Sequence, residues 1–379
     1  MADAQVLRQC MVEGLAERGE LDERWRAAFT EVPRHVFVPE LVWHQDRGFQ
    51  GDCDLVPLRR AEDPQRWLEL AYANTSVITQ VDDGHPTGEN GRGFEVSSSA
   101  SMPAVVAQML TALDAEPGMR VLEIGTGTGY NAALLAHRLG APHVVSMEID
   151  ATVAEHAQDA LAAVGYGALR VITGDGAQGY PPAAPYDRVI STAAAAEVPY
   201  SWVAQTTPGG LVLTPWGTAY YPGGLLALSV GTDGTATGKI VGSASFMWLR
   251  AQRIPRYTIG QIMRDHDAAA GSTTDLHPWY VTNDAHAATA IGLRVPGCQK
   301  FYHPHSPDIG TLYLADQHHR CWATVHITPE PPYEVRQYGH RKLWDDVETA
   351  YHWWKDTGKP TVNAWTFTIT PSEHRIELC

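Results

Sequence analysis

Val121-Leu-Glu-Ile-Gly-Thr-Gly-Thr-Gly-Tyr130 begins as an apolar strand, passes through three glycines and continues into a helix. This order brings backbone N–H groups close to a nucleotide-like ligand at the amino terminus of the helix. The spacing G-x-G-x-G differs from the G-x-G-x-x-G of dinucleotide sites, and Glu123 stands two residues before the first glycine. A carboxylate at that position suits an amine-bearing cationic ligand better than a pyrophosphate.

Strands and helices alternate after this motif. Apolar runs predict strands at 121–124, 143–148, 169–173, 187–191 and 210–214. Apolar periodicity predicts helices at 130–139 and 151–164. Because strands separated by helices require right-handed crossovers, the expected fold class is α/β, with a Rossmann-like, doubly wound and mainly parallel sheet. A hairpin at 225–230 and 239–241 is expected to finish that sheet.

The ends of two further strands add polar groups to the glycine turn. Glu148 ends the second strand, where a ribose-binding acid belongs, and Asp175 between two glycines ends the third. Together these elements describe a site for S-adenosylmethionine, with S-adenosylhomocysteine as the product. The expected cofactor contacts are Glu123, Gly125, Thr126, Gly127, Gly129, Tyr130, Glu148, Asp175 and Gly176. The alternatives are plain turn glycines with solvated strand-end acids, or a nicotinamide oxidoreductase, which Glu123 and the glycine spacing disfavour.

Outside this region, the chain consists of an amino-terminal segment and a carboxy-terminal extension. Residues 5–30 are expected to be helical, 82–93 a polar loop, and 102–113 a helix with Pro103 in its first turn. The extension is expected to be α+β, irregular over 255–310, with later elements at 312–314, 323–327, 343–354 and 364–370. The expected domains are residues 1–253, catalytic, and residues 254–379, a substrate-recognition extension.

Composition narrows the function class. The 379 residues carry a net charge of -15 and are 44% hydrophobic, which predicts a globular chain. The acidic balance argues against a protein that wraps nucleic acid or an anionic membrane surface, since both need a basic face, but it still allows a local basic groove. The five cysteines are scattered without a C-x-x-C pair, as in a reduced protein. No signal peptide and no spanning helix are visible in the sequence, so we expect a cytoplasmic protein.

A set of ordered motifs carries a family resemblance. The motifs are Pro33-Arg-His-Val-Phe-Val-Pro39, Ser101-Met-Pro103, Val121–Tyr130, Gly174-Asp-Gly176, Pro185-Tyr-Asp187 and Pro208-Gly-Gly210. Over roughly residues 5–250 the chain resembles the protein-L-isoaspartate O-methyltransferase family. The resemblance implies an S-adenosylmethionine-dependent methyltransferase that esterifies a carboxylate on a peptide. Two departures are the sequence Ser99-Ala-Ser-Met-Pro103, where repair enzymes carry Thr-Ile-Ser-Gln-Pro, and the added residues 255–379.

A second resemblance concerns a longer subfamily. Thr79-Gln-Val81 and the tryptophan-rich ending between Leu343 and Pro371 are similar to methyltransferases that accompany lanthipeptides and graspetides. This resemblance implies methylation of an ordinary Asp in a modified ribosomal precursor peptide, after which the ester closes to an aspartimide. The alternative is repair of L-isoaspartyl residues, and a rival of another class is a binding protein without turnover.

Ser101 is the expected catalytic residue, because its hydroxyl can hydrogen-bond the acceptor carboxylate. Its other interpretation is the N-cap of the helix at 102–113. Neighbouring polar residues are expected to contact the peptide, namely Ser98, Ser99, Thr79 and Gln80.

Three further patterns have weaker interpretations. His303, His305, His318, His319 and Cys321 match no common metal spacing, so no metal site is expected. Glu330-Pro-Pro-Tyr333 resembles a motif of amino-methylating enzymes but lies far along the chain from the cofactor loop. Tryptophans 344, 353, 354 and 365 are expected to be mostly core, with a peptide groove as the alternative.

Overall fold

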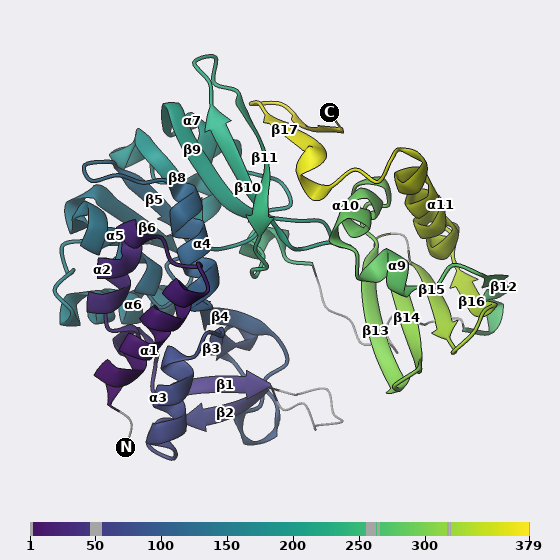
Figure 1. Cartoon of the computed structure of the whole chain (residues 1–379), viewed down its shortest axis with the longest axis horizontal. Helices are drawn as coiled ribbons and strands as arrows, with labels where there is room; N and C mark the ends of the chain where they lie inside the picture. Colours follow the sequence, from purple (N-terminus) through teal and green to yellow (C-terminus); the bar gives the residue numbers. More distant parts are fainter. Residues whose placement is uncertain are drawn as a thin grey trace.

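The structure is a computed structural model and describes residues 3–45, 55–254, 263, 266–316, 318 and 320–378. In these residues three β-sheets are joined and covered by helices (Figure 1). In Figure 1 the small amino-terminal sheet lies below the largest sheet, and the carboxy-terminal sheet lies to the right. None of the described helices combines the length and apolar composition that a membrane span requires.

The largest sheet has nine strands in the order β18-β17-β11-β10-β9-β8-β5-β6-β7 within the described chain. The parallel strands are β5 (Val121–Ile124), β6 (Val144–Glu148), β7 (Arg170–Thr173), β8 (Tyr186–Ser191) and β9 (Thr206–Trp216). The antiparallel strands are β10 (Gly224–Val230), β11 (Ala236–Ser243), β17 (Trp365–Ile369) and β18 (His374–Leu378). The predicted α/β fold with a mainly parallel, doubly wound core is confirmed.

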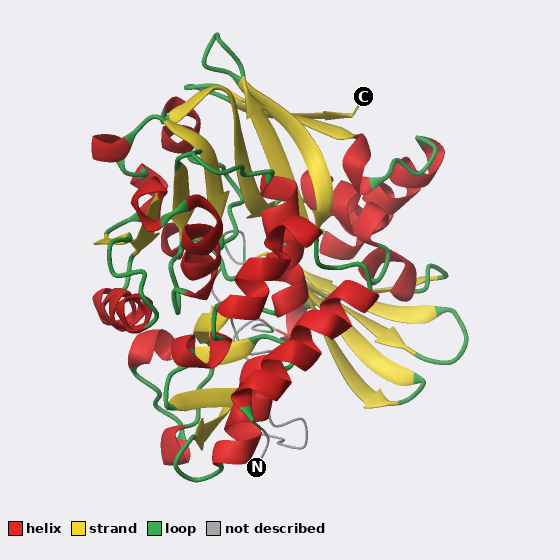
Figure 2. Cartoon of the chain, turned by 60° about the vertical axis from the view of Figure 1, so that its left-hand side comes forward, coloured by secondary structure: helices red, strands yellow, loops and turns green. Residues whose placement is uncertain are grey.

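The helices of this region agree with the apolar periodicity. Helix α5 spans Tyr130–Leu139 as predicted, and α6 spans Ala151–Ala163. Helix α4 spans Pro103–Leu113, and the short α7 spans Tyr200–Ala204. Figure 2 shows helices crossing the face of the large sheet that is turned toward the viewer.

The prediction that the hairpin finishes the sheet is wrong. Strand β17 pairs antiparallel with β11, and β18 pairs with β17, so the end of the chain returns to the large sheet. The final strand was expected within the carboxy-terminal extension. The domain boundary after residue 253 stays a prediction. However, two strands of the expected extension, β17 and β18, are part of the large sheet.

The amino-terminal part differs from a single helix over 5–30. Helix α1 (Ala4–Glu17) ends at a turn in which Gly19 has a φ of +69°, and α2 (Glu23–Glu31) begins after it. Asp22 caps α2, because its carboxylate accepts a hydrogen bond from the Arg24 backbone N–H at 2.8 Å. The local pattern of apolar residues continues across this turn, which is why periodicity alone missed it.

A four-stranded antiparallel sheet follows these helices. Its order is β2-β1-β3-β4, formed by β1 (Leu41–Gln45), β2 (Leu55–Arg59), β3 (Val77–Val81) and β4 (Val96–Ala100). Helix α3 (Pro64–Tyr72) connects β2 to β3. The predicted polar loop at 82–93 contains two short 3-10 turns, Asp82–Gly84 and Glu89–Gly91. The serine run before Ser101 therefore forms an edge strand that the sequence did not reveal.

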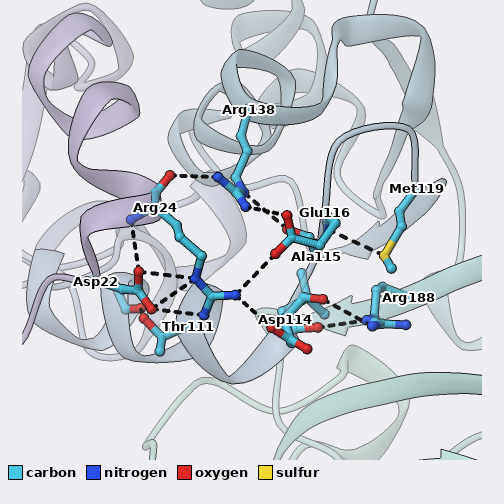
Figure 3. Close-up of polar contacts among 11 residues, drawn as sticks. Asp22, Arg24, Thr111, Asp114, Ala115, Glu116, Met119, Arg138 and Arg188 are labelled. Atoms are coloured by element: carbon cyan, nitrogen blue, oxygen red, sulfur yellow. Dashed lines mark hydrogen bonds and ion pairs between the residues drawn. The ribbon is translucent and has the colours of Figure 1, made fainter.

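Polar contacts fix the amino-terminal helices to the large sheet (Figure 3). The Arg24 guanidinium lies 2.7 Å from Asp114 and 3.2 Å from Glu116, in the turn between α4 and β5. Arg138 on α5 donates to the Arg24 carbonyl at 2.8 Å and pairs with Glu116 at 2.9 Å. These contacts hold the chain that precedes β4 against the chain that leads into the glycine turn.

The carboxy-terminal sheet is antiparallel, with strand order β12-β16-β15-β14-β13. Its strands are β12 (Ala270–Thr274), β13 (Gln299–Ser306), β14 (Ile309–Asp316), β15 (Cys321–Ile327) and β16 (Tyr333–Tyr338). Its helices are α9 (Trp279–Thr282), α10 (Ala285–Arg294) and α11 (Leu343–Asp356). The irregular segment predicted over 255–310 is wrong where described, since α9, α10, β12 and β13 lie there; residues 255–262, 264 and 265 are outside the described residues.

Two apolar cores lie on opposite faces of the large sheet. Val121 and Ile190 face the core formed with α1, α2, α4 and α5. Leu122 and Leu226 face a core that continues through α10 and α11 into the carboxy-terminal sheet. Because the second core is continuous, apolar packing joins the extension to the sheet that carries the glycine turn.

Candidate functional site

A cavity lies where the carboxyl ends of β5, β6 and β7 meet. Parallel pairing of β5 with β6 and of β6 with β7 places these ends at one edge of the sheet. We call this hollow the strand-end cavity; among its lining residues are Gly125, Thr126, Gly127, Thr128, Tyr130, Glu148, Asp150, Asp175, Gly176, Thr192, Ser99, Ser101 and Trp248. Seven of the predicted cofactor residues are in this list.

The glycine turn is shaped by close approach of the backbone. Gly125 has a φ of +88°, and a Cβ atom there would lie 2.8 Å from the Thr192 hydroxyl oxygen. Gly129 has a φ of +89° at the start of α5, and its Cβ would lie 3.3 Å from that of Ala157. Any side chain at these positions would strain the turn, so glycine is required for this close packing, and Gly125 also lines the cavity.

Glu148 is the best-placed carboxylate of the cavity. Its side chain accepts hydrogen bonds from the backbone N–H groups of Gly127 at 2.9 Å and Asp150 at 3.1 Å. Burial raises the pKa of the Glu148 carboxyl, and the Gly127 and Asp150 N–H groups counteract this shift. The group thus ties the glycine turn to the end of β6, in the position expected for an acid that accepts from ribose hydroxyls.

Glu123 is fully buried and is absent from the cavity lining. Asn131 Nδ2 donates to its carboxylate at 2.6 Å, and the Ser146 hydroxyl donates to the other oxygen. Burial raises the pKa of Glu123 to about 7. The expected direct contact with an amine-bearing ligand is therefore not visible here; the carboxylate instead fixes α5 and β6 behind the glycine turn.

Replacing Glu123 with Gln is expected to remove a pH dependence of stability. Because the folded-state pKa of Glu123 is about 7 and the reference value is 4.5, the folded protein binds more protons between these values. The free energy of unfolding should therefore fall by about 3 kcal/mol as pH rises from 4.5 to 7. Chemical denaturation of the ligand-free protein should show this fall in wild type and a shallower one in Glu123→Gln. Parallel pH profiles would contradict the assignment.

The remaining predicted cofactor residues surround the same space. The Thr126 hydroxyl oxygen lies 2.6 Å from that of Ser146, and Asp175 accepts from the Ala177 N–H at 3.0 Å. Tyr130 is buried against Phe29 and Phe37, and its hydroxyl has no hydrogen-bond partner among the described residues. Burial raises the pKa of Tyr130. Tyr130 lines the cavity, but its hydroxyl is fully buried, and its ring packs in the apolar core with Phe29 and Phe37.

Ser101 lies at the junction of two hollows. It lines the strand-end cavity and also a neighbouring depression, here called the adjoining groove, which involves all three sheets or the loops beside them. Residues that line both hollows are Ser99, Ser101, Phe246, Met247, Trp248 and Arg253. A group in the adjoining groove would thus reach the cavity past Ser101.

The N-cap interpretation of Ser101 is wrong. Helix α4 begins at Pro103 with Met102 in the N-cap position, where no side chain of the cap makes the hydrogen bond. The Ala104 N–H instead donates to the side-chain oxygen of Asn74 at 3.0 Å. The Ser101 hydroxyl is therefore not required for capping.

Arg34, in the Pro-Arg-His motif, supports the segment that contains Ser101. Its guanidinium is fully buried and donates to the carbonyls of Ala71, Ala100 and, at 3.0 Å, Ser101. Burial lowers the pKa of Arg34 to about 10. The guanidinium thus joins the end of α3 to the end of β4.

Replacing Arg34 with Met is expected to destabilise the protein by about 3 kcal/mol, because several buried carbonyl groups lose their donor. Urea denaturation should report a lower midpoint. Arg8→Met is a suitable control, since within the described part of the chain the side chain of Arg8 makes a surface contact with the Glu31 carbonyl at 3.2 Å. Equal midpoints for both variants would contradict this role for Arg34.

The four predicted peptide-contacting residues lie in different places. Ser99 lines both hollows, whereas Ser98 and Gln80 line the strand-end cavity. Gln80 donates to the Asp150 carboxylate at 3.1 Å and accepts from the Ser97 hydroxyl at 2.8 Å. Thr79 lines neither hollow; its hydroxyl donates to that of Ser98 at 3.2 Å, beside a separate pocket near residues 36–43.

Sequence reasoning missed a charged network beside the cavity. Arg253 donates to both carboxylate oxygens of Asp83, at 2.7 and 2.8 Å. Arg250 lies 3.1 Å from Asp83 and 3.8 Å from Asp150. These contacts connect the polar loop after β3 with the segment after β11. Only Asp150 had a local signal, its position two residues after Glu148.

The weaker sequence patterns lie elsewhere. Trp344, Trp354 and Trp365 are buried, which confirms the core interpretation for most of that set, and none of the four tryptophans lines the strand-end cavity or the adjoining groove. Tyr333 is buried at the start of β16 beside His277. Among the histidines that match no common metal spacing, His305 contacts Thr311 at 3.0 Å, and His319 is outside the described residues.

Comparisons with known proteins agree with this geometry. Residues 75–250 match the family model described as protein-L-isoaspartate(D-aspartate) O-methyltransferase. A protein-L-isoaspartate O-methyltransferase of Ignicoccus hospitalis is 35% identical over 52% of this chain and 72% of its own length. One of Methanoculleus marisnigri is 37% identical over 51% of this chain and 69% of its own length. A solved protein-L-isoaspartate O-methyltransferase has a similar fold, with a TM-score of 0.53, 19% identity, and coverage of 98% of this chain and 99% of its own.

Proposed function

Since the chain belongs to the protein-L-isoaspartate(D-aspartate) O-methyltransferase family, we propose that it methylates the side-chain carboxylate of an Asp in a modified ribosomal precursor peptide. Family membership makes it an S-adenosylmethionine-dependent protein carboxyl O-methyltransferase. The proposal adds the peptide substrate and the closure of the methyl ester to an aspartimide. The second candidate is repair of L-isoaspartyl residues, which the names of the relatives favour.

The cavity fits the cofactor. The glycine turn lines it through Gly125 and Gly127, Glu148 is placed to accept hydrogen bonds from ribose hydroxyls, and Asp175 stands at the end of β7. The positions proposed to contact the cofactor directly are Gly125, Thr126, Gly127, Tyr130, Glu148, Asp175 and Gly176, with Gly129 shaping the turn and Glu123 holding it from behind. When bound, the cofactor supplies an electrophilic sulfonium methyl group.

The position of Ser101 carries the functional proposal. It stands between the strand-end cavity and the adjoining groove, so a carboxylate entering from the groove meets its hydroxyl before the cavity. A carboxylate with a pKa near 4 is already ionised at neutral pH, and no general base is needed to activate it. The task of the chain is therefore positioning: Ser101 donates to one carboxylate oxygen and leaves the other directed toward the cavity.

Ester formation changes the chemistry of the peptide itself. Methoxide is a better leaving group than the carboxylate oxygen, so the backbone nitrogen of the following residue can attack the ester carbonyl. The C–N bond forms, methanol leaves with the amide proton, and a five-membered imide results. This step requires little from the enzyme.

The extension favours a specific peptide substrate over damaged proteins in general. Gln299, Lys300 and Phe301 of β13 line the adjoining groove together with Ser101, so the extension forms part of the wall that faces the acceptor. A wall of this kind selects by shape, whereas the net charge of -15 opposes general attraction of acidic peptides.

Parallel assays with three acceptors test the proposal. The enzyme and S-adenosylmethionine are incubated with an isoaspartyl peptide, the same peptide with ordinary Asp, and the modified precursor encoded beside its gene. Mass spectrometry should detect a methyl ester on the precursor, followed by loss of methanol. Turnover of the isoaspartyl peptide alone would support repair, and a stable ester would contradict aspartimide formation. Cofactor binding without any methylated product would favour the rival binding protein.

A further inference from the structure

Next to the adjoining groove, the extension contains another hollow. Its lining includes Trp279, Lys300, Tyr302, Leu312 and Pro329, and we call it the aromatic pocket. Lys300 also lines the adjoining groove, so the two hollows meet at this side chain. Lys300 and Tyr302 are two residues apart on β13 and therefore point to the same face of the strand.

Lys300 is a partly buried cation whose hydrogen-bonding capacity is mostly unused among the described residues. Its ammonium donates to the Thr282 carbonyl at 2.8 Å and lies 4.6 Å from the centre of the Tyr220 ring. An ammonium has three N–H donors, and among the described residues no carboxylate forms a salt bridge with it. Burial lowers the pKa of Lys300 to about 8, which reflects the free-energy cost of a desolvated charge without an anionic partner.

The acidic residues of both hollows leave this charge unpaired. Glu95 lines the adjoining groove, and Asp308 lines the aromatic pocket, yet neither lies within salt-bridge distance of Lys300. A peptide carboxylate would add the charge-assisted hydrogen bond that the protein itself does not provide.

The aromatic side chains are exposed although they are large and apolar. Trp279 is 63% exposed and Tyr302 is 55% exposed, and both lie beside Lys300. Strand β13 is an edge of its sheet, on the side that faces the rest of the molecule in Figure 1. Exposed aromatic rings next to an unpaired strand edge are typical of surfaces that bind extended peptide.

We propose that the aromatic pocket is a second subsite for the substrate peptide, in which an aromatic side chain packs against Trp279 and Tyr302 while Lys300 binds a neighbouring carboxylate of the same peptide. This inference rests on the proposed peptide substrate, since the occupant is the chain that continues from the acceptor in the adjoining groove. Its basis is continuity of the two hollows at Lys300 together with the charge that Lys300 leaves unmatched. The recognition element is therefore an acidic residue close to an aromatic one, separate from the acceptor Asp.

Binding measurements test the subsite without requiring turnover. Each fluorescent peptide has one central Asp and one Phe–Glu pair, and the series places this pair at successive positions on either side of the Asp. In the matched peptides, Ala replaces Phe or Gln replaces Glu. Dissociation constants are measured with the full chain loaded with S-adenosylhomocysteine. Wild type should bind one Phe–Glu register about tenfold more tightly than its Gln or Ala counterparts.

Four variants assign this preference to its residues. Lys300→Met should abolish the tenfold preference for Glu over Gln, and Lys300→Arg should retain most of it. Trp279→Ala should abolish the preference for Phe over Ala. Tyr280→Ala is the matched control, because Tyr280 is 56% exposed on the same helix but does not line the pocket, and it should change neither preference.

The outcomes separate the subsite from the proposed function. The subsite is wrong if wild type shows no register preference, or if Lys300→Met and Trp279→Ala keep it. Methyl transfer is followed in parallel with a short acceptor that lacks the Phe–Glu pair. If the acceptor is not methylated but the binding preferences remain, the proposed acceptor is wrong and the subsite stands. If all variants methylate the acceptor equally but no binding preference is found, the subsite is wrong and the proposed acceptor stands.

Discussion

Replacing Glu148 with Ala is expected to weaken S-adenosylmethionine binding by about 100-fold. The carboxylate holds the backbone N–H groups of Gly127 and Asp150, so its removal loosens the glycine turn as well as the proposed contact with the ribose. A hydrogen bond to a charged group contributes about 1.5–3 kcal/mol, and a 100-fold change, about 2.8 kcal/mol, lies within the range for loss of one such contact. Isothermal titration calorimetry with S-adenosylmethionine measures it directly.

A matched control separates this effect from a general loss of acidic charge. Glu155 is exposed on α6, a short distance along the chain from Glu148, and makes no hydrogen bond that involves the cavity. Glu155→Ala should bind the cofactor within twofold of wild type. A Glu148→Ala dissociation constant within threefold of wild type would show that the acid at the end of β6 does not contact the cofactor.

Replacing Ser101 with Ala is expected to lower kcat by about 100-fold on whichever peptide the enzyme methylates. Ser101 is proposed to position the reacting oxygen, and a misplacement of about 1 Å can cost about 100-fold in rate. The dissociation constant of S-adenosylmethionine should remain within twofold, because Ser101 is not one of the proposed cofactor contacts. The free energy of unfolding should also be unchanged, since Asn74 rather than Ser101 satisfies the first turn of α4.

Ser245→Ala provides the matched control for Ser101. Ser245 lines the adjoining groove but not the strand-end cavity, so its hydroxyl is in the same depression without access to the transferred group. Its kcat should stay within twofold of wild type. A Ser101→Ala enzyme with unchanged kcat would remove Ser101 from the reaction, and a matching loss of stability would return it to a structural role.

The glycine motif and its neighbouring strands were predictable because the physics that produces them is local. Apolar alternation and helical periodicity extend over a few residues, and the predicted helix 130–139 has the bounds of α5. Strand ends of a parallel sheet must meet at one edge, so Glu148 and Asp175 could be placed together before the structure was known. The same argument misplaced Glu123, because spacing along a strand does not reveal whether a side chain faces the cavity or the packed interior.

Pairing between distant segments was beyond such reasoning. The serine run of β4 lacks an apolar pattern, since an edge strand needs only backbone partners, here in β3. Strand β17 has an ordinary apolar alternation that suits any sheet, and only its contact with β11 places it in the catalytic sheet. Neither choice leaves a trace in a short window of sequence.

The sequence by itself determined the α/β fold, the glycine turn with its strand-end acids and the family to which the chain belongs, because these follow from local periodicity and from motifs of fixed spacing. Only the tertiary structure placed Ser101 between two hollows and showed that it does not cap helix α4. It also showed that the buried guanidinium of Arg34 binds the Ser101 carbonyl, and that Lys300 lines the same groove as Ser101. Residues about 200 positions apart, such as Ser101 and Lys300, meet only when the burial of a shared apolar core fixes two sheets against each other. That juxtaposition, rather than any motif, gives the proposed peptide site its shape.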